Sequence, residues 1–278
     1  MKTAKRLLRN FAFTSGLILT VALIVVALAA PLIAPMDPFS QDTARRLEAP
    51  SNDHPLGLDD LGRDVLSRVV WGARVSLRVG FSVVIIASLV GVTLGAMAGY
   101  FGGLMDLVVM RLCDILLAFP GILLAIALVA VLGPSLNNVV LALATIGWVG
   151  YARLVRGQVL KVREMEYVTA ARALGARSPR VIIRHVLPNV INPVIVMATL
   201  GLAGAILSEA ALSFLGLGVQ PPTPSWGAML TAGRRYLGLA NHLAIFPGAA
   251  IMLAVMGLNF LGDGLIDALD PKYRKQLT

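Results

Sequence analysis

Long uncharged runs alternate with short polar segments along the 278-residue chain. A membrane-spanning helix needs roughly 20 consecutive apolar residues, and six stretches approach or exceed that length. They lie at about 11–33, 79–100, 109–132, 136–154, 187–207 and 243–265. The runs are continuously apolar rather than alternating, which in lipid is typical of helices and not of barrel strands. We therefore expect an all-α, polytopic membrane protein with six transmembrane helices.

The first apolar run follows a basic start, as the core of a secretory signal peptide does. Signal peptides have an apolar core of about 7–15 residues, whereas residues 11–33 form a longer run. We expect an uncleaved first membrane helix. Cys113 is the only cysteine, so the chain cannot form an internal disulfide.

The formal net charge of +9 would suggest nucleic acid as a partner if the chain were soluble. With the N-terminus inside, however, the inner segments carry twice as many lysines and arginines as the outer segments. The positive-inside rule then puts both termini in the cytoplasm. The expected location is the cell (inner) membrane, and the charge needs no nucleic acid to explain it.

Two segments between the apolar runs have the composition of folded outer parts. Residues 36–78 carry acids that nearly balance their arginines, which suggests a small structured module. Residues 208–242 are first apolar and then rich in proline, which predicts a folded cap near the outer end of the fifth helix. No repeat or linker marks a second soluble domain, so we expect a single domain.

A basic segment with many small residues, 167–188, lies between two apolar runs. Within it, Tyr167, Ala170, Ala171 and Leu174 are spaced i, i+3, i+4 and i+7, which puts them on one face of a helix. The small side chains of this face would allow another surface to approach closely. The segment is therefore a candidate for contact with another protein.

The residues after this short helix predict a sharp reversal. Gly175 stands where a left-handed C-cap ends a helix, and Ser178 and Pro179 supply an N-cap and a first-turn proline for the next helix. A second interpretation is a helix that lies on anionic lipid with its arginines at the headgroups. Lipid-bound helices usually present bulky apolar side chains, and the alanines here favour contact with protein instead.

The same segment resembles the EAA loop of permease subunits of ABC importers. The tripeptide at 169–171, then Gly175, then the Leu-Pro pair at 187–188 reproduce the spacing of that loop. Thr169 stands where glutamate is usual, and His185 stands where isoleucine is usual. The stretch EYVTAARALGA is similar to the variant in dipeptide, oligopeptide and nickel permeases.

A second resemblance is independent of this loop. Residues 54–77, HPLGLDDLGRDVLSRVVWGARVSL, resemble the outside-loop signature of the C-type permease subunit in that family. The later stretches LSFLGLGVQPPTPSWGAM and LGDGLIDALDP resemble further blocks of the same subunit. The resemblance implies the type I ABC importer permease fold, half of a translocation pathway, and di- or oligopeptides as the solute.

The resemblance also implies an organisation of the chain into three parts. Residues 1–35 would be the cytoplasmic N-terminus and first transmembrane helix, and residues 36–78 an extracytoplasmic loop module. Residues 79–278 would be the permease core, with the cytoplasmic coupling loop at about 161–186.

The implied partners are a homologous B-type permease, two ATPase subunits, an extracytoplasmic substrate-binding protein and membrane lipid. In the family, the EAA loop docks in a groove of an ATPase subunit. The implied coupling residues are Tyr167, Thr169, Ala170, Ala171, Leu174, Gly175, Ala176 and Arg177. The chain has no P-loop sequence, so we expect no cofactor and no enzymatic activity in it, with ATP and Mg²⁺ bound by partner subunits.

Three glycines repeat at every fourth position of the second apolar run. Gly91, Gly95 and Gly99 form a small-xxx-small pattern, on which another helix can pack at close range. The pattern fits packing within this subunit. It also fits a contact along the pathway or with the partner permease.

Few ionisable residues lie in or near the predicted spans. We expect a local ion pair between Arg111 and Asp114, which are three residues apart. Glu209 either faces the pathway or reaches interfacial water. The acids at the end of the sixth helix, where the helix dipole disfavours them, are expected to pair with the basic loop; they are Asp263, Asp267 and Asp270.

Two other kinds of function are less well supported by the sequence. His54, His185 and His242 show no metal-ligand spacing, and the serines lack a hydrolase motif. An ion-coupled secondary transporter usually has ion or proton sites near the membrane midplane, whereas the centres of the six predicted spans contain no acid or base. The solute stays open among dipeptides, longer peptides, glutathione-like molecules and chelated nickel.

Overall fold

The structure is a computed structural model, and it describes residues 10–269. The described part is all-α: its elements are helices, and the only β-type pairing within it is an isolated bridge between Leu58 and Asp64. The α-helices are α2 (Phe11–Ile33), α3 (Val65–Phe101), α4 (Gly103–Leu117), α5 (Gly121–Leu132), α6 (Leu136–Val162), α7 (Glu166–Ala173), α8 (Ser178–Val181), α9 (Leu187–Phe214), α10 (Trp226–Arg234) and α11 (His242–Leu269). A 3₁₀ helix spans Thr43–Arg45, and a π-helical turn spans Ile182–Val186.

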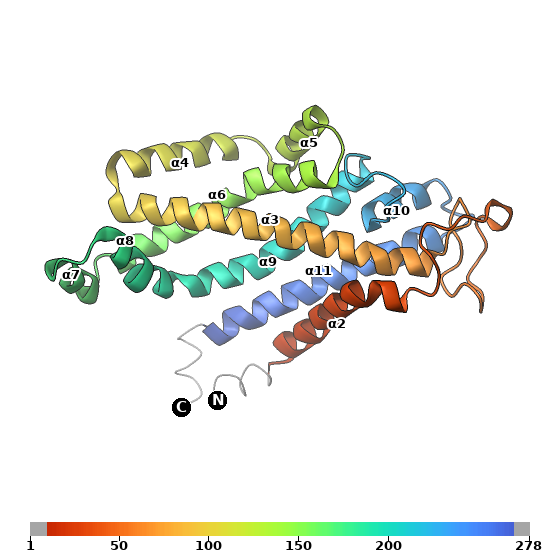
Figure 1. The fold of residues 1–278 in the computed structure, drawn as a ribbon, viewed down its shortest axis with the longest axis horizontal. Helices are drawn as coiled ribbons and strands as arrows, with labels where there is room; N and C mark the ends of the chain where they lie inside the picture. Colours follow the sequence, from red (N-terminus) through yellow and green to blue (C-terminus); the bar gives the residue numbers. More distant parts are fainter. Residues whose placement is uncertain (1–9, 270–278) are drawn as a thin grey trace.

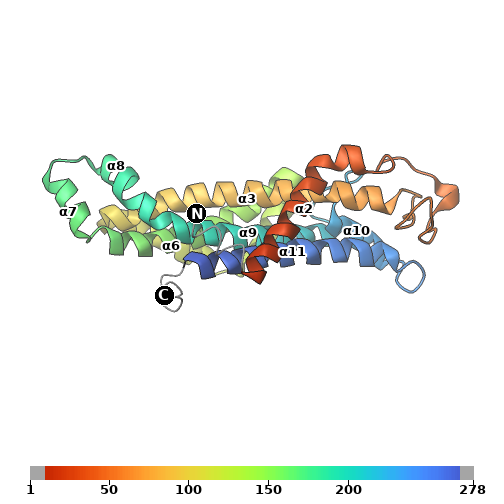
Figure 2. The same cartoon turned by 90° about the horizontal axis from the view of Figure 1, so that it is seen from below.

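The long helices lie side by side in an elongated, flat arrangement (Figures 1 and 2). Helices α7 and α8 project at one end, and α10 with the 36–64 loop lies at the other. We call these the α7 end and the α10 end. Helix α4 lies at one long edge of the layer, and α2 lies at the opposite edge beside α11.

Five helices within residues 10–269 are long and apolar enough to cross a membrane: α2, α3, α6, α8 continued through α9, and α11. Helices α4 and α5 pass the same test only together, and they are bent by 86° where they meet. The helix predicted over 109–132 is therefore broken in two, and the six predicted spans are reached when the bent pair counts as one. Pro120 stands at the break, and proline both lacks an N–H and disfavours helical backbone in the residue before it.

Helix α3 starts well before the predicted start at residue 79. Asp64 caps its N-terminus by accepting a 2.7 Å hydrogen bond from the Ser67 amide, and the helix then runs for 37 residues. Such a helix is about 55 Å long, whereas the apolar core of a bilayer is about 30 Å thick. The first turns of α3, which carry Arg68, Arg74 and Arg78, therefore extend beyond the span, and they overlap the segment assigned to the loop module.

The loop over residues 36–64 is held on the helices by buried polar contacts. His54 Nδ1 lies 3.1 Å from Asp64 Oδ1, and both side chains are buried. Arg63 Nε donates to Asp59 Oδ2 at 2.7 Å, and Arg68 Nη1 donates to the Pro38 carbonyl at 2.9 Å. These contacts fasten the loop to the first turns of α3.

The segment over residues 208–242 forms the expected folded cap. Trp226 at the start of α10 is buried, and its Nε1 donates to the Val69 carbonyl of α3 at 2.9 Å. Gly72 leaves room for this indole, because a Cβ on that glycine would lie 2.6 Å from Trp226 Cδ1. At the α10 end, the cap thus closes directly on α3.

Candidate functional site

The predicted coupling segment lies at the tip of the α7 end (Figure 1). Helix α7 is part of the connection that leads from α6 to α9. Val168 is completely buried against the body of the protein, whereas Tyr167 is 45% exposed and Leu174 is 89% exposed. Ala170 is also exposed, and Ala171 is half-buried. The face predicted from the i, i+3, i+4, i+7 spacing therefore points largely away from this chain.

Gly175 ends α7 in a left-handed conformation. Its φ is +80°, its amide donates to the Arg172 carbonyl at 2.9 Å, and the Ala176 amide donates to the Ala171 carbonyl at 3.1 Å. These two bonds are those of a Schellman motif. A Cβ on Gly175 would meet nothing within 4 Å, so the turn needs glycine for its backbone conformation and not for space.

Two arginine contacts hold the α7 segment against the end of α3. The Arg172 guanidinium lies 4.7 Å from the ring centre of Tyr100, and Arg163 Nη1 donates to the Gly99 carbonyl at 2.8 Å. Cation–π contacts of this kind are worth about 0.5–1 kcal/mol at exposed sites. The position of α7 is thus linked to α3 as well as to α6 and α9.

The remaining residues of the predicted coupling set are at the surface or at the turn. Thr169 is exposed, and its hydroxyl lies 3.4 Å from the Met165 carbonyl of its own helix. Ala176 packs against the core, and Arg177 is exposed. The prediction of Ser178 as an N-cap was wrong, because Arg177 occupies the cap position and makes no capping bond through its side chain.

The three glycines of the small-xxx-small pattern face α6 within this chain. A Cβ on Gly91 would lie 2.5 Å from the Trp148 carbonyl oxygen, and one on Gly99 would lie 2.9 Å from Val159 Cβ. A Cβ on Gly95 would lie 2.9 Å from Ala152 Cα. The glycines therefore allow α3 and α6 to touch through their backbones. Of the two interpretations of the pattern, the structure shows packing within this subunit rather than a contact with a partner.

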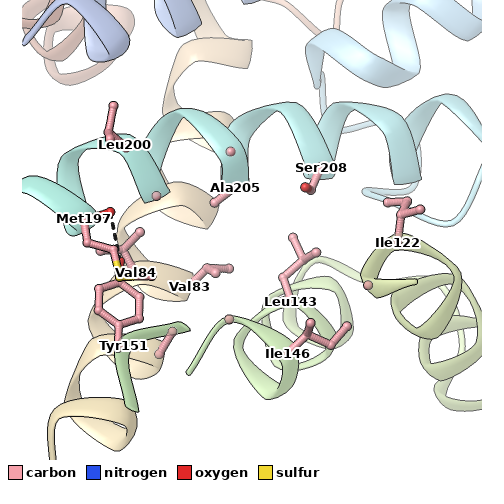
Figure 3. A pocket seen from close by; sticks show the side chains of 15 residues that line it. Val83, Val84, Ile122, Leu143, Ile146, Tyr151, Met197, Leu200, Ala205 and Ser208 are labelled. Atoms are coloured by element: carbon pink, nitrogen blue, oxygen red, sulfur yellow. Dashed lines mark hydrogen bonds between the residues drawn. The ribbon is translucent and has the colours of Figure 1, made fainter. Parts of the chain in front are cut away.

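A cavity of about 490 Å³ lies between α3, α5, α6 and α9 (Figure 3). Its lining residues are Val83, Val84, Ala87, Gly121, Ile122, Leu143, Ile146, Gly147, Tyr151, Met197, Leu200, Gly201, Gly204, Ala205 and Ser208. Only Tyr151 and Ser208 among them have polar side chains, and none is charged. Such a wall can hold a solute without selecting for the charge of the solute's side chains.

The sequence analysis did not find this cavity. A signal was present, because Gly147, Gly201 and Gly204 remove side chains from α6 and α9 at the height of the cavity. Small residues in apolar helices also mark close helix packing, however. Only the way the four helices are assembled distinguishes the two.

Glu209 does not line the cavity. It is completely buried, and its Oε1 accepts a 2.6 Å hydrogen bond from the Ser213 hydroxyl. The hydroxyls of Ser76 on α3 and Ser225 before α10 also face this carboxyl group. Glu209 Oε2 and Ser76 Oγ have no hydrogen-bond partner. Glu209 therefore neither lines this cavity nor reaches interfacial water. It lies buried at the α10 end, where serines of α3 and of the segment before α10 face it.

The expected ion pairs were partly wrong. Asp114 pairs with Arg153 of α6 and not with Arg111, and Asp106 pairs with Arg156 of the same helix. Asp267 accepts a 3.0 Å hydrogen bond from Asn10 and not from the basic loop. Asp263 is exposed, and Asp270 lies outside the described residues. The charges near the α7 end therefore connect neighbouring helices.

No group of three or more His, Cys, Asp or Glu side chains within residues 10–269 has the arrangement of a metal site. Cys113 is buried as a free thiol. The described helices thus provide an apolar cavity and an exposed short helix, rather than a set of reactive groups.

Comparisons with known proteins agree with this architecture. Residues 91–275 match the family of binding-protein-dependent transport system inner membrane components, and residues 2–50 match the N-terminal TM domain of oligopeptide transport permease C. The chain is 48% identical to the dipeptide transport system permease protein of Alkalihalophilus pseudofirmus, over 97% of this chain and 89% of that protein.

Two further relatives are permeases for a different solute. The glutathione transport system permease protein of Pectobacterium atrosepticum is 44% identical over 97% of this chain and 90% of its own length. The corresponding protein of Escherichia coli O157:H7 is 45% identical over 96% and 88%. Because the first family match covers more than half of the chain and these relatives are similar over nearly all of it, the chain belongs to the binding-protein-dependent transport system inner membrane components, the permease subunits of ABC importers.

Proposed function

We propose that this chain is the C-type permease subunit of an importer for short peptides, and that it forms half of the translocation pathway. The observation that carries the proposal is the uncharged cavity among α3, α5, α6 and α9. Peptides share a backbone but differ in the charge of their side chains, so a wall without charges suits them as a class. The relatives support this class, since a dipeptide and glutathione are both short peptides.

The exposed face of α7 is the proposed contact with an ATPase subunit. Tyr167, Ala170 and Leu174 are exposed together on a helix whose other side is anchored through Val168. Tyr167 and Leu174 leave apolar surface exposed on the same helix face, and contiguous apolar surface of this kind marks protein contacts. ATP and Mg²⁺ would then bind to the ATPase subunits, and closure of these subunits would move α7.

The proposed orientation has the α7 end in the cytoplasm and the α10 end outside. The concentration of lysine and arginine around α7 supports it through the positive-inside rule. Both termini would be cytoplasmic, and the 36–78 module with the α10 cap would face the substrate-binding protein. A homologous B-type permease would complete the pathway, and the permease core would extend over 79–278.

Peptide import is favoured over import of a bare nickel ion, because the cavity wall lacks metal ligands. The wall has neither histidine nor carboxylate, the side chains that a bare divalent transition metal would need. Membership of the ABC importer family also removes the ion-coupled secondary transporter as an alternative. Glutathione stays within the proposed class because it is itself a short peptide.

An uptake assay tests the proposal. Cells without their own peptide permeases would express this chain with its neighbouring permease, ATPases and binding protein, and uptake of labelled dialanine, glutathione and nickel would be measured. We expect uptake of at least one peptide, and none when the P-loop lysine of the ATPases is replaced. Uptake of nickel alone, or peptide uptake that persists with the lysine variant, would overturn the proposal.

A further inference from the structure

The end of the cavity nearest to α7 is closed by one side chain from α6. Tyr151 is 4% exposed and lies between glycines on two other helices. A Cβ on Gly91 of α3 would lie 2.5 Å from Tyr151 Cβ, and a Cβ on Gly201 of α9 would lie 2.8 Å from the Tyr151 hydroxyl. The ring thus bridges from α3 to α9 through space that only glycines leave open.

A second side chain makes the reciprocal contact. Met197 of α9 extends toward α6, where a Cβ on Gly150 would lie 2.5 Å from Met197 Cε. The Tyr151 hydroxyl lies 3.4 Å from the Met197 carbonyl oxygen, at the long limit of a hydrogen bond (Figure 3). Each helix therefore inserts one large side chain at a glycine of the other, and the two contacts close the floor of the cavity.

The floor is continuous with the coupling helix through buried side chains. One apolar cluster contains Tyr151, Met197 and Val168, the buried anchor of α7. We call the valines of this cluster the valine column: Val155, Val159 and Val162 of α6, Val168 of α7, Val181 of α8, Val186 of the π-helical turn, and Val190 and Val194 of α9. Close-packed interiors transmit displacement because they contain little free volume.

We propose that Tyr151 and Met197 form the cytoplasmic gate of the cavity, and that the valine column connects this gate to α7. The proposal rests on the peptide-import function and assigns its gate to named residues. Movement of α7 displaces the ends of α6 and α9 that flank it, and the floor is where these two helices interlock. Two side-chain contacts and one long hydrogen bond hold the floor, so a modest displacement suffices to separate it.

The contacts at the α10 end differ from those at the floor, and the difference indicates which end of the cavity opens. At the α10 end, α10 packs between α3 and α9: the Trp226 indole donates to the Val69 carbonyl of α3, and a Cβ on Gly227 would lie 2.4 Å from the Ala210 carbonyl oxygen of α9. At the floor, by contrast, glycines face the two large side chains, and the hydrogen bond from the Tyr151 hydroxyl is 3.4 Å long, against 2.9 Å for that of Trp226. A ring that withdraws from Gly201 also leaves an opening beside the glycine backbone.

A thiol-labelling experiment on the whole importer tests the gate. Ser208 lines the cavity 11 positions beyond Met197 along α9, and Ser208→Cys in a Cys113→Ser background reports access to that position. In inside-out vesicles, an impermeant maleimide reaches this thiol from the cytoplasmic face only when the floor is open. We expect slow labelling of the otherwise unchanged importer, and a rate that changes when ATP is added.

Substitutions at the floor should raise the labelling rate without nucleotide. Tyr151→Ala is expected to raise it about tenfold, because labelling follows the population with an open floor. Met197→Ala should act in the same direction, and it keeps the test valid if Tyr151→Ala fails to assemble. The control is Leu143→Ala, which enlarges the same cavity from the same helix two turns further from α7 and should leave the rate within about twofold.

A double-mutant cycle tests the connection to α7. If the valine column transmits the motion, Val168→Ala should abolish the effect of ATP on labelling, and it should change nothing further when Tyr151→Ala is already present. Equal labelling rates for Tyr151→Ala, Met197→Ala and Leu143→Ala would overturn the gate. Additive effects in the cycle would overturn the connection.

The assay contains no peptide, so it separates this proposal from the function on which it rests. If the labelling rates change as expected but no peptide is taken up, the gate is supported and the peptide assignment is refuted. Peptide uptake together with labelling rates that are unchanged by Tyr151→Ala and Met197→Ala would support the function and refute the gate.

Discussion

A Cβ atom on Gly95 of α3 would lie 2.9 Å from the Cα atom of Ala152 on α6. Real Cβ atoms do not approach a backbone carbon so closely without displacement, so the two helices are in contact through their backbones. The same is true one turn away in each direction, at Gly91 and Gly99. The glycines therefore let α3 and α6 pack as closely as their backbones allow.

The contact predicts that bulk at Gly95 destabilises the subunit. Gly95→Leu should lower the free energy of unfolding by about 1–3 kcal/mol, as overpacking does in other cores, and Gly95→Ala should have a smaller effect of the same sign. Thermal unfolding of the purified importer measures both.

Gly157 provides the matched control for this prediction. It lies in α6, and a Cβ on it would meet nothing within 4 Å. Gly157→Ala should therefore stabilise the helix by about 0.5–1 kcal/mol, since glycine is disfavoured in helix interiors. A Gly95→Ala variant as stable as Gly157→Ala would show that α3 and α6 are not in backbone contact in the assembled protein.

Much of the helical framework could be predicted from hydropathy, and the exceptions have definite causes. The bounds of α2 agree with the predicted run at 11–33, because no charge interrupts the run and the helix continues through Pro31. The start of α3 was missed because Arg68, Arg74 and Arg78 break the apolar run without breaking the helix. A long helix that extends past the membrane does not have to remain apolar.

The positions that link helices were harder to predict than the helices themselves. Gly175 was found because a left-handed cap is a local requirement of the backbone, and its φ of +80° agrees. The partner of Asp114 was not found, because Arg153 on another helix competes with the near neighbour Arg111. The cavity and the surroundings of Glu209 depend on three or four elements meeting, which spacing along one helix cannot reveal.

Glu209 should be replaceable by its amide but not by a small residue. Glu209→Gln keeps the volume and an oxygen for the Ser213 hydroxyl, and its NH₂ group can donate toward Ser76 Oγ, which now has no partner. We expect thermal stability close to that of the unchanged protein. Glu209→Ala leaves a void and an unpaired hydroxyl and should cost about 2–4 kcal/mol. If both variants unfold at the same temperature, Glu209 does not join α9 to its neighbours.

The proposed orientation predicts which surface thiols react from outside the cell. Ser51 lies in the exposed 36–64 loop, and Ala170 is exposed on α7 at the opposite end. Ser51→Cys should react with an impermeant maleimide in intact cells, whereas Ala170→Cys should react only after lysis. The native Cys113 is buried and should contribute little signal. Reaction of Ala170→Cys in intact cells, with Ser51→Cys reacting only after lysis, would show that the orientation is the opposite of the one proposed.

Gly175 should be essential for coupling because of its backbone conformation. A residue with a Cβ adopts the left-handed region at a cost of roughly 1 kcal/mol or more, and β-branched valine is among the least suited to it. Gly175→Val should therefore leave the subunit in the membrane but change the end of α7, so that the Tyr167 and Leu174 face no longer fits the ATPase. Purified complexes should retain less ATPase subunit, and solute-stimulated ATP hydrolysis should be lost.

Two further substitutions separate this explanation from its alternatives. Gly175→Asn should be tolerated far better than Gly175→Val, because asparagine visits the left-handed region and nothing within 4 Å opposes a side chain there. Arg177→Gln removes one positive charge but keeps the turn, so docking on a protein groove should survive it. If Arg177→Gln uncouples hydrolysis at low salt while Gly175→Val does not, α7 acts through charge on anionic lipid. The exposed face of α7 would then not be a docking surface.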